Sequence, residues 1–81
     1  MANFNLGLAV CRVRERAEGA QFEYIKYFRK NKINFDDKTN PLVNNYRELI
    51  KIGKTGADNC ETEADTQALM NRIAELKKIV K

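Results

Sequence analysis

The stretch that decides the fold is TEADTQALMNRIAELKKIV, residues 62–80. Its apolar side chains recur at intervals of three and four residues, the spacing that lines one face of an α-helix. They are Ala68, Leu69, Ile73, Leu76, Ile79 and Val80. Thr62, followed three positions later by Asp65, fits a capping box, in which each side chain accepts from the other residue's backbone N–H. The stretch therefore predicts a helix that begins near Thr62 and buries one apolar stripe.

A second helix is predicted to begin at Asn40 and Pro41 and to end at Gly53. Asn is favoured as an N-cap, and Pro is tolerated at the first helical position because its missing N–H would have no partner there. Glycine at position 53 is typical of a helix stop, and Gly56 is expected to keep the following loop open. The expected buried face comprises Leu42, Val43, Tyr46, Leu49 and Ile50.

The first third of the chain carries two competing patterns. Helical spacing predicts a single helix from about Asn5 to Asn31, bent near Gly19. Its buried side would comprise Leu6, Val10, Val13, Ala17, Ala20, Tyr24, Tyr27 and Phe28. Apolar residues also alternate over residues 4–13, which is the pattern of a β-strand. The long helix is favoured, because the sequence contains no second strand pattern with which a strand could pair.

Together these segments predict an all-α fold, a small three-helix bundle formed by one domain, residues 1–81. Residues 32–39 are expected to form a loop, with Ile33 and Phe35 packed beneath it. Short connections place neighbouring helices antiparallel, so the first and third helices should run in the same direction. A domain of this length buries only about two-thirds of its unfolded surface, which favours additional support from a homo-oligomer.

The composition excludes several kinds of active site. The chain has no His and no Ser, so Ser–His catalysis is excluded, and no side chain titrates near neutral pH without a large pKa shift. Cys11 and Cys60 form no CxxC pair and have no His to complete a metal site, which predicts two reduced thiols. Residues 53–56, GKTG, lack the Gly that a phosphate loop needs five positions before Gly53, where Glu48 stands. We therefore expect a protein that is not an enzyme and uses no cofactor or metal.

Charge gives the first indication of a functional surface. The formal net charge is +4, which permits an acidic partner. Acids are expected early in the helices, as with Glu15 and Glu18, and bases late, the distribution that helix macrodipoles favour. In an up-down-up bundle the ends of the first and third helices meet at one pole, near Asp36 and Asp37 of the intervening loop. We define the basic pole by the residues Lys26, Arg29, Lys30, Lys32, Lys77, Lys78 and Lys81.

These features predict a non-catalytic binding or regulatory module that acts on a protein partner, through a helical face or through the basic pole. Phe22 lies off the apolar stripe and marks a candidate contact surface. Nucleic-acid binding is the alternative, because residues 22–32 interleave aromatic and basic side chains that can stack on bases and neutralise phosphates. No apolar run reaches the length of a membrane span, and the expected location is cytoplasmic.

Overall fold

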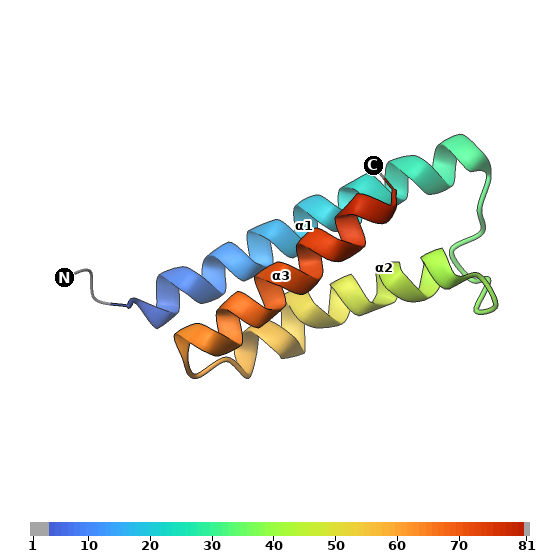
Figure 1. Ribbon diagram of the computed structural model, residues 1–81. Helices are drawn as coiled ribbons and strands as arrows, with labels where there is room; N and C mark the ends of the chain where they lie inside the picture. Colours follow the sequence, from blue (N-terminus) through green and yellow to red (C-terminus); the bar gives the residue numbers. More distant parts are fainter. Residues whose placement is uncertain (1–3, 81) are drawn as a thin grey trace.

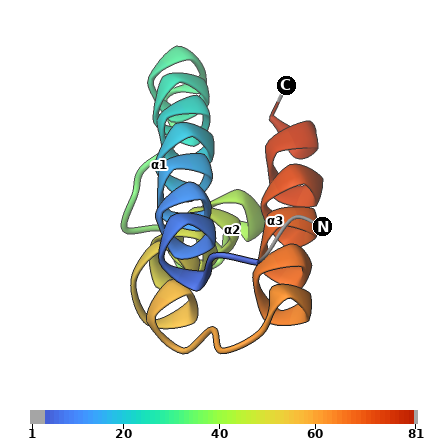
Figure 2. The ribbon, with the colours of Figure 1, turned by 90° about the vertical axis from the view of Figure 1, so that its left-hand side faces the viewer.

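The computed structural model describes residues 4–80 and shows a bundle of three helices (Figure 1). They are α1 (Leu6–Asn31), α2 (Pro41–Lys51), which continues into the π-helical segment η1 (Ile52–Gly56), and α3 (Glu63–Ile79). The predicted all-α three-helix bundle is confirmed. Helices α1 and α3 run in the same direction, and α2 packs antiparallel behind them (Figure 2).

Helix α1 begins where the helical pattern predicted. The Asn5 side chain caps it by accepting a hydrogen bond from the Leu8 backbone N–H at 3.0 Å. The alternative of a strand over residues 4–13 is therefore wrong. The helix passes through Gly19 as an unbroken α-helix, with Val13, Ala17, Ala20, Tyr24 and Phe28 on its buried side. Leu6, expected on the same side, is exposed because it lies in the first turn, at the open end of the bundle.

The end of the second helix was predicted wrongly. Asn40 and Pro41 do begin α2, with the Asn40 side chain accepting from the Leu42 N–H. However, the chain does not stop at Gly53 or open at Gly56, because η1 extends the helical path to Asp58. The reason for Gly53 is packing: a Cβ at this position would lie 3.2 Å from the Ala17 Cβ. The missing side chain thus lets η1 approach α1 closely.

Helix α3 begins with the predicted capping box. The Thr62 hydroxyl accepts from the Asp65 N–H at 3.2 Å, and the Asp65 carboxylate accepts from the Thr62 N–H at 3.1 Å. Ile73 and Leu76 are buried as expected, and Val80 is nearly so. Ala68 and Ile79 are exposed, because the face that α3 buries is narrower than the predicted stripe.

The core lies between α1 and the other two helices. Its largest fully buried side chains are Tyr24, Phe28, Leu49, Leu76, Val13 and Val43. Aromatic contacts hold the loop that precedes α2 against the helices. The ring of Phe35 packs edge to face against the rings of Phe28 and Tyr46, with centroid distances of 5.1 Å and 5.5 Å. Ile33 is half-buried against the same core, as predicted, whereas Phe35, also predicted to pack beneath the loop, remains 38% exposed although its ring contacts Phe28 and Tyr46.

The bundle is elongated, measuring 48 × 20 × 15 Å. Its length follows from α1, whose 26 residues exceed the other two helices. Among the described residues, no helix combines the length and apolar character required to cross a membrane.

Candidate functional site

The basic pole lies along the last turns of α1, against which the end of α3 packs (Figure 1). Both helices carry bases in their last turns, Arg29 and Lys30 in α1 and Lys77 and Lys78 in α3. All the described members of the pole are exposed, whereas Lys81 lies outside the described residues. The two sets of bases come from helix ends far apart in the sequence, and Figure 1 shows the end of α3 beside the last third of α1.

One buried hydrogen bond fixes the end of α3 against α1, about two turns before α1 ends. The hydroxyl of Tyr24, on α1, donates to the backbone carbonyl of Leu76, in the last turn of α3, at 2.6 Å. Burial raises the pKa of Tyr24, so the hydroxyl keeps its proton and remains a donor at neutral pH. Because Lys77 directly follows Leu76, this bond sets the position of the α3 bases relative to those of α1.

The end of α1 holds Lys32 in an unusual backbone conformation. Lys32 has φ 54° and ψ 41°, in the left-handed region that side chains rarely adopt. Its N–H donates to the Arg29 carbonyl, and the Ile33 N–H donates to the Phe28 carbonyl at 2.9 Å, which is a Schellman ending. Ile33 packs against the core immediately afterwards, and this apolar contact offsets the strain and points Lys32 outward.

Few acids neutralise the basic pole. Lys26 pairs with Glu23 at 3.2 Å, and it is the one member with an ion pair among the described residues. The Asp37 carboxylate accepts from the Thr39 N–H and hydroxyl, which lower the pKa of Asp37 and hold its charge within the loop. A shallow hollow of about 440 Å³ lies between α1 and the end of α3. It is lined by Glu23, Lys26, Tyr27, Lys30, Asn31 and Val80.

The sequence predicted acids early and bases late in each helix. The bases follow this distribution, whereas most of the acids do not. Helices α1 and α2 have no acid in the first turn, whereas α3 has Glu63 and Asp65. Glu15 and Glu18, predicted to lie early in the first helix, stand in the middle of α1, nine and twelve positions after its first residue, Leu6.

Phe22 is exposed on α1, outside the core, as its position in the pattern predicted. Its side chain is 59% exposed, and the Lys26 Nζ lies 5.5 Å from the ring centroid. This aromatic ring thus borders the basic pole. The structure brings Phe22 and the described bases of α1 to one stretch of helix.

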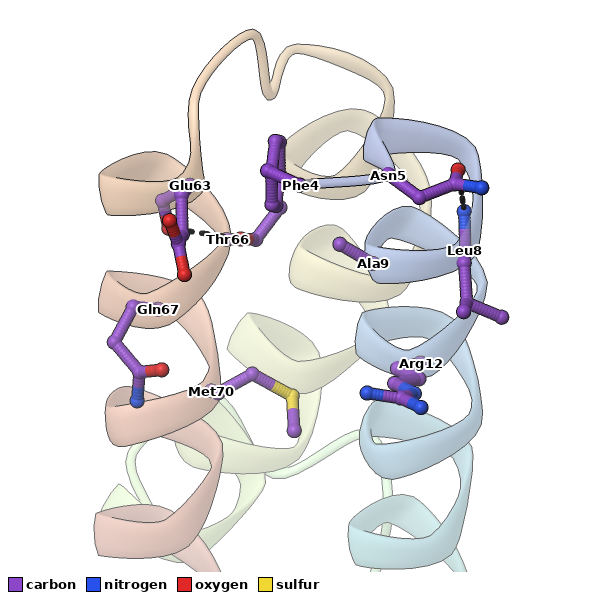
Figure 3. A pocket seen from close by; sticks show the side chains of 9 residues that line it. All are labelled: Phe4, Asn5, Leu8, Ala9, Arg12, Glu63, Thr66, Gln67 and Met70. Carbon is purple, nitrogen blue, oxygen red and sulfur yellow. Dashed lines mark hydrogen bonds between the residues drawn. The ribbon is translucent and has the colours of Figure 1, made fainter. Parts of the chain in front are cut away.

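The structure also contains a groove that sequence analysis missed, at the end opposite the basic pole. It has a volume of about 340 Å³ and lies between the first turns of α1 and α3 (Figure 3). Its lining residues are Phe4, Asn5, Leu8, Ala9, Arg12, Glu63, Thr66, Gln67 and Met70. The signal in the sequence is the small side chains of Ala9 and Thr66, which leave space where a core would need larger groups.

The residues that bear on catalysis and metal binding lie apart from one another. Within residues 4–80, no group of His, Cys, Asp or Glu side chains is arranged to hold a metal ion. Cys11 is exposed and Cys60 is buried, and both are free thiols. Burial raises the pKa of Cys60, which disfavours the nucleophilic thiolate. The GKTG segment is part of η1 and supplies no phosphate loop.

Comparison with protein-family models, with curated proteins and with solved structures finds no match to this chain. The candidate site therefore consists of what the residues themselves present: a basic pole at one end of the α1–α3 pair and a groove at the other.

Proposed function

We propose that this chain is a non-catalytic binding module that docks on an acidic surface of a protein partner through the basic pole. The observation that carries the proposal is that the end of α3 packs against the last third of α1. The Tyr24–Leu76 hydrogen bond holds them together, and most of the exposed bases there have no acid partner among residues 4–80. An exposed free thiol, Cys11, persists in reducing compartments, so we extend the proposal to a cytoplasmic location.

Helix-end electrostatics alone accounts for some of these bases. A Lys or Arg in a last turn stabilises its own helix by about 0.3–1 kcal/mol, whether or not a partner exists. The same effect extends to Lys32 at the C-cap of α1, and Lys26, which lies before the last turn, pairs with Glu23. The proposal therefore rests on the packing that brings the bases of two separate helices to one surface.

Two of the eight bases outside the basic pole form ion pairs within residues 4–80. Arg14 pairs with Asp58, and Arg72 pairs with Glu48 and Glu75. The Arg72 Nη2 donates to the Glu48 carboxylate at 2.9 Å and so joins α3 to α2. Such pairs serve the fold, whereas the basic pole presents charge to the solvent.

The test compares a variant of the basic pole with a matched control. The pole variant carries Arg29→Glu, Lys30→Glu, Lys77→Glu and Lys78→Glu. The control carries Arg16→Glu, Lys38→Glu, Lys51→Glu and Lys54→Glu, all at exposed positions outside the pole. Both variants change the net charge equally, so a general effect of charge is the same in the two.

The probe is a fluorescent polyglutamate peptide, titrated with protein at low salt and at physiological salt. We expect the pole variant to bind at least about tenfold more weakly than the control, because unlike charges at the docking surface become like charges. Salt should weaken binding of the unmodified protein. Equal losses in the pole variant and the control would contradict the proposal. Circular dichroism checks that both variants keep their helix content.

Nucleic-acid binding is the second candidate, favoured by one observation. Phe22 offers an exposed aromatic face beside Lys26, an arrangement that can stack a base next to a neutralised phosphate. A single-stranded oligonucleotide titrated in parallel separates the two functions. Tighter binding than to polyglutamate, weakened by Phe22→Ala and falling steeply with salt, would favour nucleic acid over a protein partner.

A further inference from the structure

The groove at the open end of the bundle exposes apolar groups that the fold leaves uncovered. Phe4 is 42% exposed and Leu8 is 52% exposed, although both line the groove. Ala9 and Met70 form its floor from opposite helices (Figure 3). Exposed apolar groups concentrated around one groove are typical of an interaction surface.

The charges at its rim indicate what kind of surface fits the groove. Arg12 on α1 and Glu63 on α3 stand at diagonally opposite corners (Figure 3). Within residues 4–80, neither side chain forms an ion pair. A twofold axis that lies across the groove, at right angles to the line between these corners, exchanges the two positions. A second copy placed by this axis sets each Arg12 against the other copy's Glu63, so the groove is complementary to itself.

The molecule also exposes more surface than a compact monomer of the same mass. Its accessible surface is 5847 Å², whereas a compact monomer of 9.4 kDa exposes about 5000 Å². The radius of gyration, 13.6 Å, likewise exceeds the roughly 12 Å of a compact domain of this length. This excess follows from the elongated shape of the bundle, 48 × 20 × 15 Å, which leaves surface along its whole length for contact with a second copy.

We infer that the groove is the interface of a twofold homodimer, in which Arg12 of each copy pairs with Glu63 of the other over a floor of apolar side chains. This inference is independent of the proposed function, because the basic pole lies at the far end of the α1–α3 pair. Both poles stay exposed in the dimer, which thus presents two docking surfaces and gains affinity for a partner with repeated acidic sites.

The decisive experiment uses two charge variants, Arg12→Glu and Glu63→Arg, and analytical ultracentrifugation of the full chain. The unmodified protein should dimerise at concentrations between low micromolar and submillimolar. Each variant alone should raise the dissociation constant at least about a hundredfold, because both rim contacts then join like charges. An equimolar mixture of the two variants should restore the dimer, because the carboxylates of one copy then face the guanidinium groups of the other.

The mixture distinguishes the interface from a simple effect of folding. Neither single variant can recover in the mixture if the substitutions merely damage the helices, and thermal melts of each variant alone measure such damage directly. An unmodified protein that stays monomeric throughout the concentration range would overturn the inference. Two variants that remain monomeric when mixed would overturn it as well.

Two variants that replace an exposed apolar residue with Glu test where on the molecule the dimer contact lies. Leu8→Glu places a charge at the edge of the groove, at an exposed position in the first turn of α1 where an acid favours the helix. Phe22→Glu is the matched control on the same helix, at an exposed position outside the groove. We expect Leu8→Glu to weaken the dimer at least about tenfold and Phe22→Glu to leave it unchanged. The reverse result would place the interface at Phe22 and contradict the inference.

Discussion

Different side chains stand between α1 and α3 at the two ends of the pair, and only one end is filled. Where both helices end, Tyr24 and Phe28 are completely buried, and the Tyr24 hydroxyl bonds the Leu76 carbonyl. Where both helices begin, the facing positions carry Ala9 and Thr66, which are too small to fill the space between the helices. One end is therefore packed with aromatic rings and the other retains a groove.

This difference shows how one bundle separates two kinds of surface. At the closed end the aromatic side chains of the core are buried, and the exposed side chains are the bases near the two helix ends together with Phe22 and Ile79. At the open end Phe4 and Leu8 remain in solvent, and charges stand only at the rim. Packing thus leaves a surface rich in bases at one end and a groove with both apolar and polar lining at the other.

The largest expected effect comes from removing the aromatic filling of the closed end. Phe28→Ala should lower the free energy of unfolding by about 3–5 kcal/mol, because Phe28 is fully buried and its removal leaves a cavity. That is a large share of the about 5–15 kcal/mol typical of a domain. Phe4→Ala, at the open end, should cost the monomer about 0.5 kcal/mol or less. Urea denaturation at low protein concentration measures both, and similar losses at the two ends would contradict the comparison.

A smaller effect is expected from the hydrogen bond that joins the closed ends. Tyr24→Phe keeps the ring but leaves the buried Leu76 carbonyl without its donor, which should cost about 1–3 kcal/mol. Tyr27→Phe is the matched control, since Tyr27 is half-buried on the same helix. Hydrogen exchange should also show faster opening of the last turn of α3 in Tyr24→Phe alone. Equal stability of the two variants would show that the hydroxyl contributes little.

The periodic pattern of the sequence was sufficient for the architecture, because each helix buries a stripe that only helical spacing produces. The caps at Asn40 and Thr62 were predictable for the same reason, since a side chain three or fewer positions away satisfies the first backbone donors. The role of Gly53 was not predictable. A glycine that ends a helix and one that admits a neighbouring helix look alike in a sequence, and only the position of Ala17 distinguishes them.

The two candidate surfaces also differ in how far the sequence alone predicts them. The basic pole was predictable in outline, because topology alone places the ends of two parallel helices together. The groove was not, because it depends on which small residue of α1 faces which small residue of α3. Ala9 and Thr66 are ordinary helix residues by themselves, and the space between them exists only once both helices are placed.

A substitution that fills the groove should stabilise the monomer and weaken the dimer. Ala9→Leu adds a branched side chain that points toward α3 (Figure 3). We expect it to stabilise the monomer by about 1 kcal/mol, as cavity-filling substitutions commonly do. The same side chain would occupy space that a second copy needs, so the dimer should weaken while the monomer gains stability. A variant that is less stable, or that dimerises more tightly, would show that the groove has no room for the added group.

The smallest expected effect concerns acid at the beginning of α3, beside the groove. The Asp65 carboxylate accepts from the Glu61 and Thr62 backbone N–H groups and contacts the Thr62 hydroxyl, which together lower the pKa of Asp65. The unfolded value is about 4, so the stabilisation is fully present above that pH and is lost as the pH falls through the lower folded value. The Asp65→Asn variant should lack this loss, so the stability of the variant should decline less steeply than that of the unmodified protein between about pH 5 and pH 2.

The control is Glu63→Gln, which removes an acid from the same turn without breaking a hydrogen bond to the capping N–H groups. Urea denaturation across this pH range measures all three proteins. If Glu63→Gln flattened the profile as much as Asp65→Asn, general charge on the first turn, rather than the capping box, would set the response to acid.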